Sequence, residues 1–292
     1  MPTLVFLSGC PLRCSWCSNP EGQFLRPRVM YRERKCVHTY YRCVRACPNN
    51  AVWIEDDESP PLRFDRSICD RCDSMDCVKA CLSEALQIAG RTYTVDELMR
   101  VLIRDQGFWG SQGGVTFSGG EPLFQAGFLL AVLEKCRSNY MHTAVETSAH
   151  ADTDLLMEVL KQTDWTFIDI KHMDSAAHRA ETGAGNELIL QNIETIASAG
   201  WDGRLIIRVP IVPGYNDTIE NLQATAAFMV ECNLKEVNLL PFHRLGRSKY
   251  EQLDLNYKYA QVPSPSREVM QSHQRIFEAA GLQCYVGSET PF

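Results

Sequence analysis

Residues 113–122 read Gly113-Gly-Val-Thr-Phe-Ser-Gly-Gly-Glu-Pro122, a short β-branched and apolar run that ends in two glycines and a glutamate. Residues 124–137 follow, with apolar side chains spaced as in an amphipathic helix. The same succession of a short apolar run and a helical segment continues towards the C-terminus. This alternation is typical of parallel strands covered by helices, so we expect an α/β fold.

The other units of the alternation lie on both sides of this stretch. We expect strands at Thr3–Leu7 and at residues 142–147, 166–171, 205–209, 236–240 and 283–286. Helical spacing occurs at residues 154–161, 186–199, 219–232 and 266–280. Polar side chains recur at the strand ends, namely Glu121, Glu146, Asp169, Lys171, Arg208 and His243. Because strand ends converge at the mouth of a parallel barrel, we expect a full or partial TIM-like (β/α) barrel.

Residues 33–90 interrupt the alternation. They hold seven cysteines, few long apolar runs and an acidic, proline-containing stretch at residues 55–61. A segment of this kind is typical of a small module organised around metal. A capping box at Thr94–Glu97 then starts a helix. We therefore expect a barrel domain at residues 1–32 and 91–292, with an inserted module at residues 33–90.

Composition and charge restrict the possible functions. The chain has 292 residues, of which 45% are hydrophobic and 22% charged, as in a globular protein with a sizeable core. The net charge of −7 offers no basic face for nucleic acid. No apolar run is long enough to span a membrane. The apolar start of the chain lacks the basic region of a signal peptide, so we expect a cytoplasmic protein.

The thirteen cysteines are the main chemical clue. In a reducing cytoplasm they are not expected to form structural disulfides, and ten of them lie between Cys10 and Cys81. Clustered thiols in that compartment indicate metal binding. Three cysteines stand alone, namely Cys136, Cys232 and Cys284. We expect these three to be buried apolar residues without a chemical role.

Three cysteines follow the first strand with the spacing Cys10-x3-Cys14-x2-Cys17. Three thiolates in one loop can ligate three irons of a [4Fe–4S] cubane. The fourth iron has no cysteine in this run, and an open metal position is typical of a catalytic site. Zinc is the alternative, although structural zinc needs four ligands and no further cysteine or histidine lies nearby. Trp16, inside the loop, is expected to shield the cluster.

The cysteine triplet together with Gly119-Gly-Glu-Pro122 resembles the radical S-adenosylmethionine (SAM) superfamily. The resemblance implies that the open iron chelates the amino and carboxylate groups of SAM. One electron then splits the sulfonium into methionine and a 5′-deoxyadenosyl radical, which abstracts hydrogen. Cys10, Cys14 and Cys17 would thus be the catalytic cluster ligands. The glycines would let backbone groups approach the SAM amine closely, because glycine lacks a Cβ atom.

The insert contains two cysteine runs that resemble the bacterial ferredoxin pattern. They are Cys36-x6-Cys43-x3-Cys47 and Cys69-x2-Cys72-x4-Cys77-x3-Cys81. In ferredoxins the last cysteine of each run ligates the other cluster. The resemblance therefore implies a complete site of Cys69, Cys72, Cys77 and Cys47. It also implies a second site, of Cys36, Cys43 and Cys81, that is one thiolate short.

We accordingly expect one or two auxiliary [4Fe–4S] clusters in the insert. The missing thiolate of the second site leaves several possibilities open. His38 could supply a ligand, since imidazole also binds iron. The site could instead hold a cluster with fewer irons, be distorted, or hold none. Zinc is the alternative metal for the whole module.

Further segments resemble the activating enzymes of glycyl radical enzymes, in the subgroup with a ferredoxin-like insert. The similarity extends over almost the whole chain and is carried by Cys10–Glu21, Gly113–Pro122, Val145–Ser148, Asp169–Lys171, Gly183–Asn186, Arg208–Gly214 and Leu239–Gly246. It implies hydrogen abstraction from one glycine Cα of a partner enzyme, which then stores a glycyl radical. A flavodoxin or ferredoxin would donate the electron. We expect a monomer, with no nucleic-acid or membrane partner.

The resemblance assigns SAM contacts at the predicted barrel mouth. Gly119, Gly120 and Glu121 would bind the SAM amine. Lys171 would pair with the SAM carboxylate through a charge-assisted contact. Relatives carry a short segment before the first strand, whereas this chain starts almost at that strand. We therefore expect either a misplaced start codon or a truncation.

Five further residues have implied roles at the same mouth. Arg208 and His243 would contact SAM or the incoming peptide. Glu146, Thr147 and Asp169 would hold a monovalent cation. Simpler roles are also open, because the two carboxylates could pair with neighbouring basic residues. Thr147 could be only a strand former, and His243 a packed residue at a strand end.

Two other functions fit parts of the pattern. The chain could run a different radical SAM reaction, on a small molecule or in the maturation of another enzyme. It could also be a non-catalytic iron–sulfur electron carrier, which would not need Gly119–Pro122 or Lys171. Only an activating oxidoreductase would leave a persistent glycine-centred EPR doublet in a partner protein.

Overall fold

The computed structural model describes residues 2–37, 41–55, 62–110 and 113–290. Its largest element is a seven-stranded sheet in which every neighbouring pair is parallel. In spatial order the strands are β1 (Thr3–Leu7), β6 (Val115–Gly119), β7 (Thr143–Thr147), β8 (Trp165–Asp169), β9 (Arg204–Ile211), β10 (Glu236–Pro241) and β11 (Gln283–Val286). The expected parallel α/β fold is therefore confirmed.

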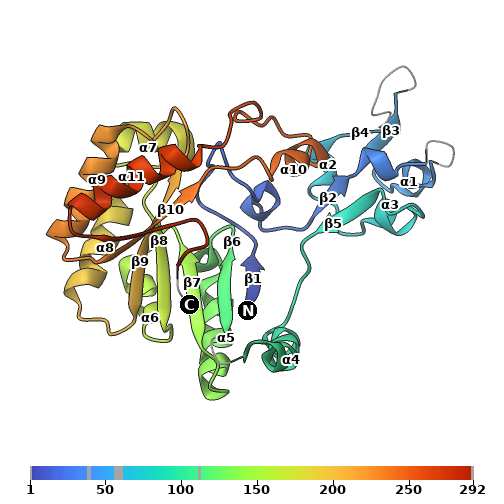
Figure 1. Cartoon of the computed structure of the whole chain (residues 1–292). Coiled ribbons are helices and arrows are strands. Elements are labelled where there is room, and N and C mark those ends of the chain that lie inside the picture. Colours follow the sequence, from blue (N-terminus) through green and yellow to red (C-terminus); the bar gives the residue numbers. More distant parts are fainter. Residues whose placement is uncertain (1, 38–40, 56–61, 111–112, 291–292) are drawn as a thin grey trace.

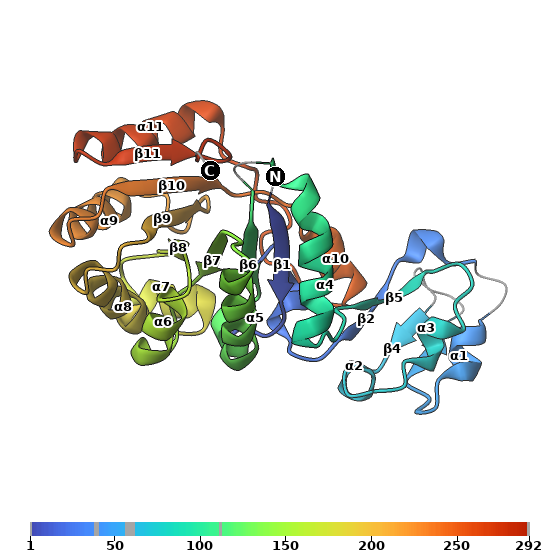
Figure 2. The same cartoon turned by 90° about the horizontal axis from the view of Figure 1, so that it is seen from below.

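Helices connect the strands of this sheet. They are α4 (Val95–Asp105), α5 (Ala126–Ser138), α6 (Thr153–Leu160), α7 (Ser175–Thr182), α8 (Glu187–Ser198), α9 (Ile219–Glu231), α10 (Arg247–Gln252) and α11 (Arg267–Ala279). Figures 1 and 2 show α5, α6, α8, α9 and α11 along one side of the sheet. The predicted capping box is present at the start of α4, where Glu97 N donates to Thr94 Oγ1 and Thr94 N donates to Glu97 Oε2.

The sheet has two edges, β1 and β11. Among the described residues no hydrogen-bonded pairing joins these two strands. A full barrel, one of the two expected forms, would require that pairing. The strand pairing found here gives a parallel sheet that is not closed.

The two faces of the sheet have different roles. Successive side chains of a strand point to opposite faces. On β7, β8 and β9, the residues of the main hydrophobic core include Val145, Ile168 and Ile207. A small second cluster comes from the residue before each of them, namely Ala144, Phe167 and Ile206. The opposite face therefore has only a thin apolar layer at this level.

Charged side chains follow this thin apolar layer at the carboxyl ends of the same strands. Glu146, Asp169 and Arg208 each come two residues after a member of the second cluster, so they lie on the same face. The strand register places Asp169 directly opposite Arg208. Strand periodicity thus concentrates charge at one end of one face.

The insert has its own small core beside the sheet (Figures 1 and 2). Strand β2 (Arg28–Tyr31) pairs antiparallel with β5 (Leu86–Ala89), and β3 (Val52–Ile54) pairs antiparallel with β4 (Leu62–Phe64). The helices of the insert are short: α1 (Arg42–Ala46), α2 (Arg66–Cys69) and α3 (Asp76–Lys79). Four cysteines are buried in this core, namely Cys43, Cys47, Cys69 and Cys77.

Arg66 joins the insert to the larger domain. Its Nη1 donates to the carbonyl oxygen of Val29 at 2.6 Å, in strand β2, which precedes the insert and pairs with its strand β5. Its Nε donates to Asp254 Oδ2 at 2.8 Å, and its Nη2 donates to the carbonyl oxygen of Gln252 at 3.2 Å. One guanidinium therefore connects the insert to the end of α10.

Helices α7 and α10 were not expected from the sequence. Helix α7 has few apolar residues, so its hydrophobic periodicity is weak. Its two ends carry helix signals instead: the Asp174 side chain accepts from Ala177 N, and Gly183 has a φ of 86° at the C-cap. These capping residues were the available signal for α7.

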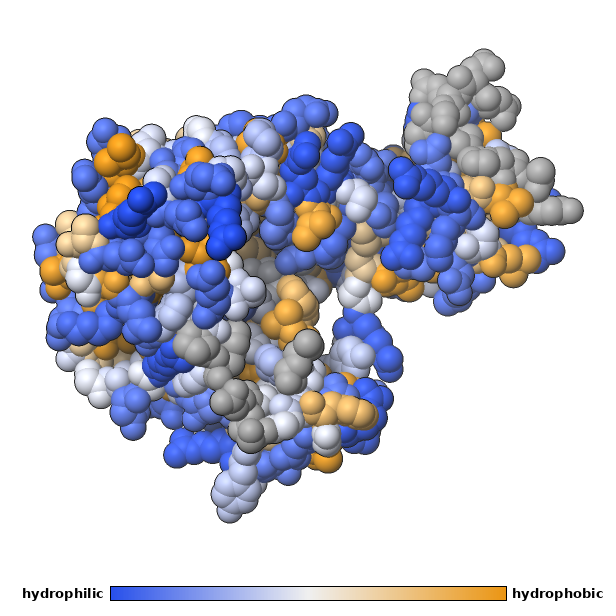
Figure 3. Space-filling view, in the orientation of Figure 1, coloured by the Kyte–Doolittle hydropathy of each residue, from blue (hydrophilic) through white to orange (hydrophobic). Residues whose placement is uncertain are grey.

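The surface and the isolated cysteines fit a protein with one main core. Figure 3 shows mainly hydrophilic side chains over the helices on this face of the molecule. No helix in the described part of the chain is both long and apolar enough to cross a bilayer. Cys136 and Cys284 are buried, as expected, whereas Cys232 is only partly buried against the main core.

Candidate active site

One pocket at the carboxyl ends of the parallel strands gathers the predicted site. It has a volume of about 230 Å³. Its lining includes every predicted cluster and SAM residue of the larger domain: Cys10, Cys14, Trp16, Cys17, Gly119, Gly120, Glu121, Glu146, Lys171, Arg208 and His243. Thr147 and Asp169, predicted to hold a cation, line it too. The structure therefore brings together residues that lie far apart in the sequence.

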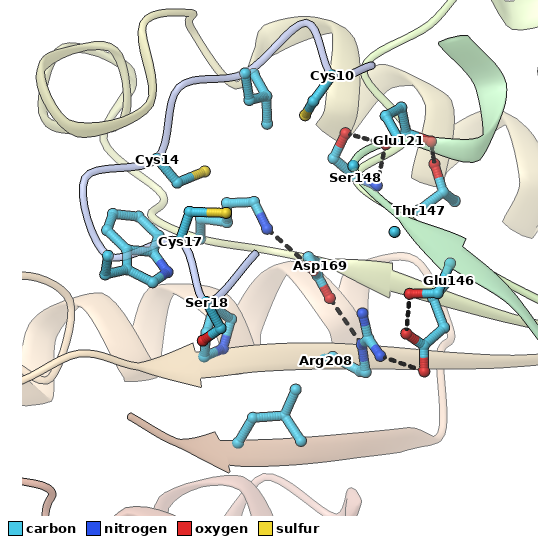
Figure 4. Close-up of a pocket in the computed structure, with 18 of the residues that line it drawn as sticks. Cys10, Cys14, Cys17, Ser18, Glu121, Glu146, Thr147, Ser148, Asp169 and Arg208 are labelled. Carbon is cyan, nitrogen blue, oxygen red and sulfur yellow. Dashed lines mark hydrogen bonds and ion pairs between the residues drawn. The ribbon is translucent and has the colours of Figure 1, made fainter. Parts of the chain in front are cut away.

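The loop with the cysteine triplet is held by the end of α7. Arg13 N donates to the carbonyl oxygen of Thr182 at 2.7 Å, and Ser15 N donates to that of Glu181 at 2.9 Å. Figure 4 shows the three thiols on the same side of the pocket. The contacts with α7 fix the loop backbone, so the three thiols are held where they could ligate one cluster.

In the protein without a bound cluster, burial keeps the three thiols protonated. It raises the pKa of Cys10 to about 11 and that of Cys14 to about 12, and it also raises the pKa of Cys17. The positive charge of Lys171 acts in the opposite direction on all three. Metal ligation requires thiolates, so cluster assembly must release protons here.

Two glycines allow the triplet loop to pack against β6. Gly119 has a φ of 121°, and a Cβ there would lie 2.3 Å from the carbonyl oxygen of Leu7. A Cβ on Gly120 would lie 2.2 Å from the carbonyl oxygen of Gly22 and 2.4 Å from that of Gly9. Gly120 N donates to the carbonyl oxygen of Leu7 at 2.8 Å. Both glycines are therefore required by the close approach of the backbones.

The Glu121 carboxylate accepts hydrogen bonds from neighbouring residues of the chain. It is 2% exposed. Oε1 accepts from Thr147 Oγ1 at 2.6 Å, and Oε2 accepts from Ser148 Oγ at 2.6 Å and from Ser148 N at 2.8 Å. Leu123 N donates to Oε1 as well, at 3.2 Å. Figure 4 shows Glu121 turned towards Thr147 and Ser148. This carboxylate fixes the turn after β6 to the end of β7.

A chain of charged groups crosses the floor of the pocket (Figure 4). Lys171 Nζ donates to Asp169 Oδ2 at 2.8 Å, and Arg208 Nε donates to Asp169 Oδ1 at 2.8 Å. Arg208 Nη1 lies 2.8 Å from Glu146 Oε1, and Ser118 Oγ donates to Glu146 Oε2 at 2.6 Å. Glu146 thus pairs with Arg208, and Asp169 pairs with both Arg208 and Lys171. Pairing with neighbouring basic residues was the simpler role predicted for the two carboxylates.

Electrostatics in this chain favour the charged forms. Burial alone would raise the pKa of Asp169, but Arg208 and Lys171 outweigh it and lower the pKa to about 2. Burial alone would lower the pKa of Lys171, but the Asp169 carboxylate outweighs it and raises that pKa. The same competition raises the pKa of Arg208 through Asp169 and Glu146. All three side chains are therefore ionised at neutral pH.

An aromatic layer supports the triplet loop. Trp16 is 8% exposed, and its ring centroid lies 4.8 Å from that of Tyr215 and 6.3 Å from that of Tyr259. This packing agrees with the shielding expected of Trp16. His243, in contrast, is exposed at the rim of the pocket. A packed structural role, the simpler prediction for His243, does not fit that exposure.

Three residues of the site were not predicted from the sequence. Ser148 binds Glu121, and Gln23 hydrogen-bonds the Cys17 thiol and lowers its pKa against the effect of burial. Asn216 is fully buried and donates through Nδ2 to the carbonyl oxygens of Lys171 and Pro210, at 2.9 and 2.6 Å. Two of them had a local signal: Ser148 ends the Val145–Ser148 segment of the family resemblance, and Asn216 follows the Pro-Gly turn at residues 213–214.

The cysteines of the insert fall into two groups. In the first, which we call the four-thiol group, the pKa of Cys77 is raised to about 12, chiefly by burial and also by the neighbouring thiols of Cys69, Cys47 and Cys72. In the second, the three-thiol group, burial raises the pKa of Cys43, and the thiols of Cys81 and Cys36 add to the rise. The same thiols are grouped in the crossed pattern, but their ligation of clusters stays a prediction.

No fourth ligand accompanies the three-thiol group in the described residues. His38, the residue considered for that role, lies outside them. Among the described residues, no three His, Cys, Asp or Glu side chains form a group able to hold a single metal ion. A zinc site, the alternative for these cysteines, needs four ligands around one ion.

Comparison with known proteins identifies the family. The profile of the Radical SAM superfamily matches residues 4–228. That match includes the cysteine triplet, the insert and the charged residues of the pocket floor. The chain belongs to the radical SAM superfamily.

Individual relatives narrow the family further. The 4-hydroxyphenylacetate decarboxylase activating enzyme of Clostridioides difficile (strain CD196) is 46% identical over 292 residues, which cover 99% of this chain and 92% of the relative. The indoleacetate decarboxylase activating enzyme of Tractidigestivibacter scatoligenes is 38% identical over 289 residues, with coverages of 97% and 91%. Within its superfamily the chain is therefore one of the activating enzymes of glycyl radical enzymes.

A solved structure agrees with this assignment. It is a domain of the pyruvate-formate lyase-activating enzyme from Bacteroides vulgatus ATCC 8482, with a TM-score of 0.51 and 34% sequence identity. The alignment covers 60% of this chain and 99% of that domain. The likeness supports the α/β radical SAM fold described above.

Proposed function

We propose that this chain activates a glycyl radical enzyme by abstracting hydrogen from one glycine Cα. The observation that carries the proposal is the single pocket in which the cysteine triplet faces the Lys171–Asp169–Arg208–Glu146 chain. Three thiols with no fourth cysteine beside them fit a cluster with one open iron. Fixed charges opposite those thiols fit a cofactor that carries both a carboxylate and an amine.

The residues that would hold the cofactors follow from the pocket. Cys10, Cys14 and Cys17 would ligate the [4Fe–4S] cluster, which supplies the electron that splits SAM into methionine and a 5′-deoxyadenosyl radical. Lys171 would bind the SAM carboxylate, because its ammonium is buried and already faces the pocket. The amine would bind the backbone at Gly119 and Gly120.

The remaining lining residues position other groups of the site or shield the site from water. Glu121 holds the turn that carries the two glycines, while Asp169 orients Lys171 and Arg208. Trp16 excludes water behind the triplet loop. His243, exposed at the rim, would meet the incoming peptide. The monovalent cation expected near Glu146, Thr147 and Asp169 stays a prediction, since these side chains have partners in the protein.

We infer that the fold is a partial barrel with a ferredoxin-like insert in residues 33–90. At least one auxiliary [4Fe–4S] cluster would be ligated by the four-thiol group, whose Cys47 thiol also accepts from Ala51 N at 3.2 Å. Flavodoxin or ferredoxin would be the electron donor. The chain would act as a cytoplasmic monomer.

The relatives suggest the class of the partner. Two of them are named as activators of arylacetate decarboxylases, for 4-hydroxyphenylacetate and indoleacetate. We propose that the partner of this chain is likewise a glycyl radical decarboxylase. Which arylacetate it uses would depend on the partner's own active site.

The test is a direct assay of radical transfer. The chain is reconstituted with iron and sulfide without oxygen, reduced, and mixed with SAM and one candidate partner. Partners would be 4-hydroxyphenylacetate decarboxylase, indoleacetate decarboxylase and, as a contrast, pyruvate formate-lyase. We expect SAM cleavage and a glycine-centred EPR doublet with a decarboxylase. SAM cleavage with no doublet in any partner would reject the activating role, and a doublet only with the lyase would reject the partner class.

A further inference from the structure

The insert contains two copies of one structural unit. In the first copy, α1 leads to Cys47, and Asn50 three residues later has a φ of 50°. In the second copy, α3 leads to Cys81 after Ala80, and Glu84 three residues later has a φ of 55°. The main chain closes the same turn in each, since Asn50 N donates to the carbonyl oxygen of Cys47 and Glu84 N to that of Cys81. The two copies are therefore comparable position by position.

The copies differ in the stretch before the helix. The second copy has Cys69, Cys72 and Cys77, spaced x2 and x4. The first copy has only Cys36 and Cys43, spaced x6. Cys36 thus corresponds to Cys69, and no residue of the first copy supplies the thiol that Cys72 supplies in the second. The missing position is therefore a particular one, the second cysteine of the run.

The position of Cys72 in the four-thiol group indicates which side of the three-thiol group is open. Cys69 and Cys77 are buried, whereas Cys72 is only partly buried and its thiol lies beside the exposed Ser74 hydroxyl. By the correspondence of the two copies, the thiol absent from the three-thiol group is the one nearest to solvent.

A cavity borders the three-thiol group. Its volume is about 220 Å³, and its lining includes Cys36, Cys43 and Cys81. Val37 and Leu82 line it as well, and these two side chains are 59% and 78% exposed. In the described residues, the cavity thus adjoins exposed side chains on one side and, on the other, thiols that pack against the core of the insert.

No other cysteine of the chain can complete the group. The four-thiol group uses the remaining cysteines of the insert, and the triplet lies in its own pocket. The last three cysteines are in the larger domain, at α5, at the end of α9 and in β11. Four-thiolate ligation, which bacterial ferredoxins have at both of their clusters, does not fit the three-thiol group.

We propose that the three-thiol group holds a second auxiliary iron–sulfur cluster whose fourth iron has no cysteine ligand and instead binds a small donor from solvent, hydroxide or a low-molecular-weight thiol. This inference rests on the proposed function only in giving the insert iron–sulfur clusters. It makes the second site chemically different from the four-thiol group. An iron without a protein thiolate is the one that oxidation removes most readily.

The test isolates the insert from the SAM cluster, which also has an open iron. A Cys10→Ala/Cys14→Ala/Cys17→Ala variant of the full chain is reconstituted without oxygen and treated with ferricyanide. Ferricyanide takes one electron from a [4Fe–4S]²⁺ cluster, which then loses Fe²⁺ and leaves [3Fe–4S]⁺. We expect about eight irons per chain before oxidation and about one [3Fe–4S]⁺ EPR spin per chain afterwards.

Cys72→Ala in the same background is the matched control. It gives the four-thiol group the same missing position, so we expect about two [3Fe–4S]⁺ spins per chain. As a second readout, Mössbauer spectra of the background variant should contain one distinct iron in about eight, shifted by added 2-mercaptoethanol. This measurement does not depend on the folding of the Cys72 variant.

Two results would overturn the inference. One is a chain that binds only about four irons, which would leave the three-thiol group without a cluster. The other is a full complement of iron that yields no [3Fe–4S]⁺ spin and no thiol-sensitive iron, which would mean that a protein side chain caps the fourth iron. Either result, in a protein whose native form still cleaves SAM, would leave the proposed function intact.

Discussion

Asp169 and Arg208 lie opposite each other on neighbouring strands, and Arg208 Nε donates to Asp169 Oδ1 at 2.8 Å. The side chains of the two residues are 17% and 15% exposed. At this burial, removing one partner leaves a charge in a poorly solvated place, which costs far more than breaking a surface pair. Lys171 and Glu146 extend the pair in both directions, so the floor of the pocket is one electrostatic unit.

The first prediction concerns the pH dependence of Asp169→Asn. The pKa of Asp169 is lowered to about 2, so its carboxylate stabilises the folded protein above the pKa of an exposed aspartate. That stabilisation, about 2 kcal/mol, is lost as the pH falls from about 4 through 2. Urea unfolding of iron-free protein should show a deficit for the variant at pH 7 that shrinks over this interval. The surface variant Asp96→Asn should show a much smaller deficit, and equal deficits would contradict the prediction.

A second prediction separates SAM binding from cluster binding. Lys171→Met removes the buried ammonium but none of the cysteines. Loss of one charge-assisted contact of about 1.5–3 kcal/mol should weaken SAM binding roughly 10- to 100-fold. Equilibrium binding to the reconstituted protein measures the affinity, and iron analysis should give unchanged cluster content. Lys135→Met, which removes a surface pair with Asp96 at 2.8 Å, is the matched control. If Lys171→Met binds SAM with native affinity, Lys171 does not contact SAM.

Much of this site could be predicted because its signals are local. The triplet is contiguous in sequence, and the charged residues mark strand ends that parallel topology brings to one edge. Strand periodicity then fixes the face on which Glu146, Asp169 and Arg208 lie. Helix α4 was placed through its capping box, which needs only four residues.

The parts that escaped prediction depend on contacts between distant residues. Ser148 meets Glu121 across 27 residues, and Asn216 meets the carbonyl oxygen of Lys171 across 45. Neither contact leaves a periodic pattern in the chain. Whether the sheet closes is likewise decided by its two edges, β1 and β11, which lie at opposite ends of the sequence. Secondary-structure signals cannot report such pairings.

The third prediction concerns the carboxylate of Glu121. Each of its oxygens accepts hydrogen bonds from donors, so Glu121→Gln would turn an amide NH₂ towards one of them. An unsatisfied buried group should cost about 1–3 kcal/mol, measured as a lower free energy of unfolding. Thr147→Ser should cost less, because the hydroxyl can still donate to Glu121 Oε1 and accept from Ala149 N. If Thr147→Ser costs as much as Glu121→Gln, the carboxylate is not the centre of this network.

The fourth prediction tests the close approach of backbones beneath the triplet. In Gly120→Ala the new Cβ would lie 2.2 Å from the carbonyl oxygen of Gly22, and backbone atoms would have to move. We expect this change to cost about 1–3 kcal/mol of stability. It should also reduce the iron bound at the triplet after reconstitution, because the displaced segment carries those thiols.

Gly127→Ala is the matched control, since nothing lies within 4 Å of its added Cβ in α5. That variant should be neutral or up to about 1 kcal/mol more stable. Equal iron content in both variants would show that the loop tolerates the shift and that Gly120 is not needed for packing.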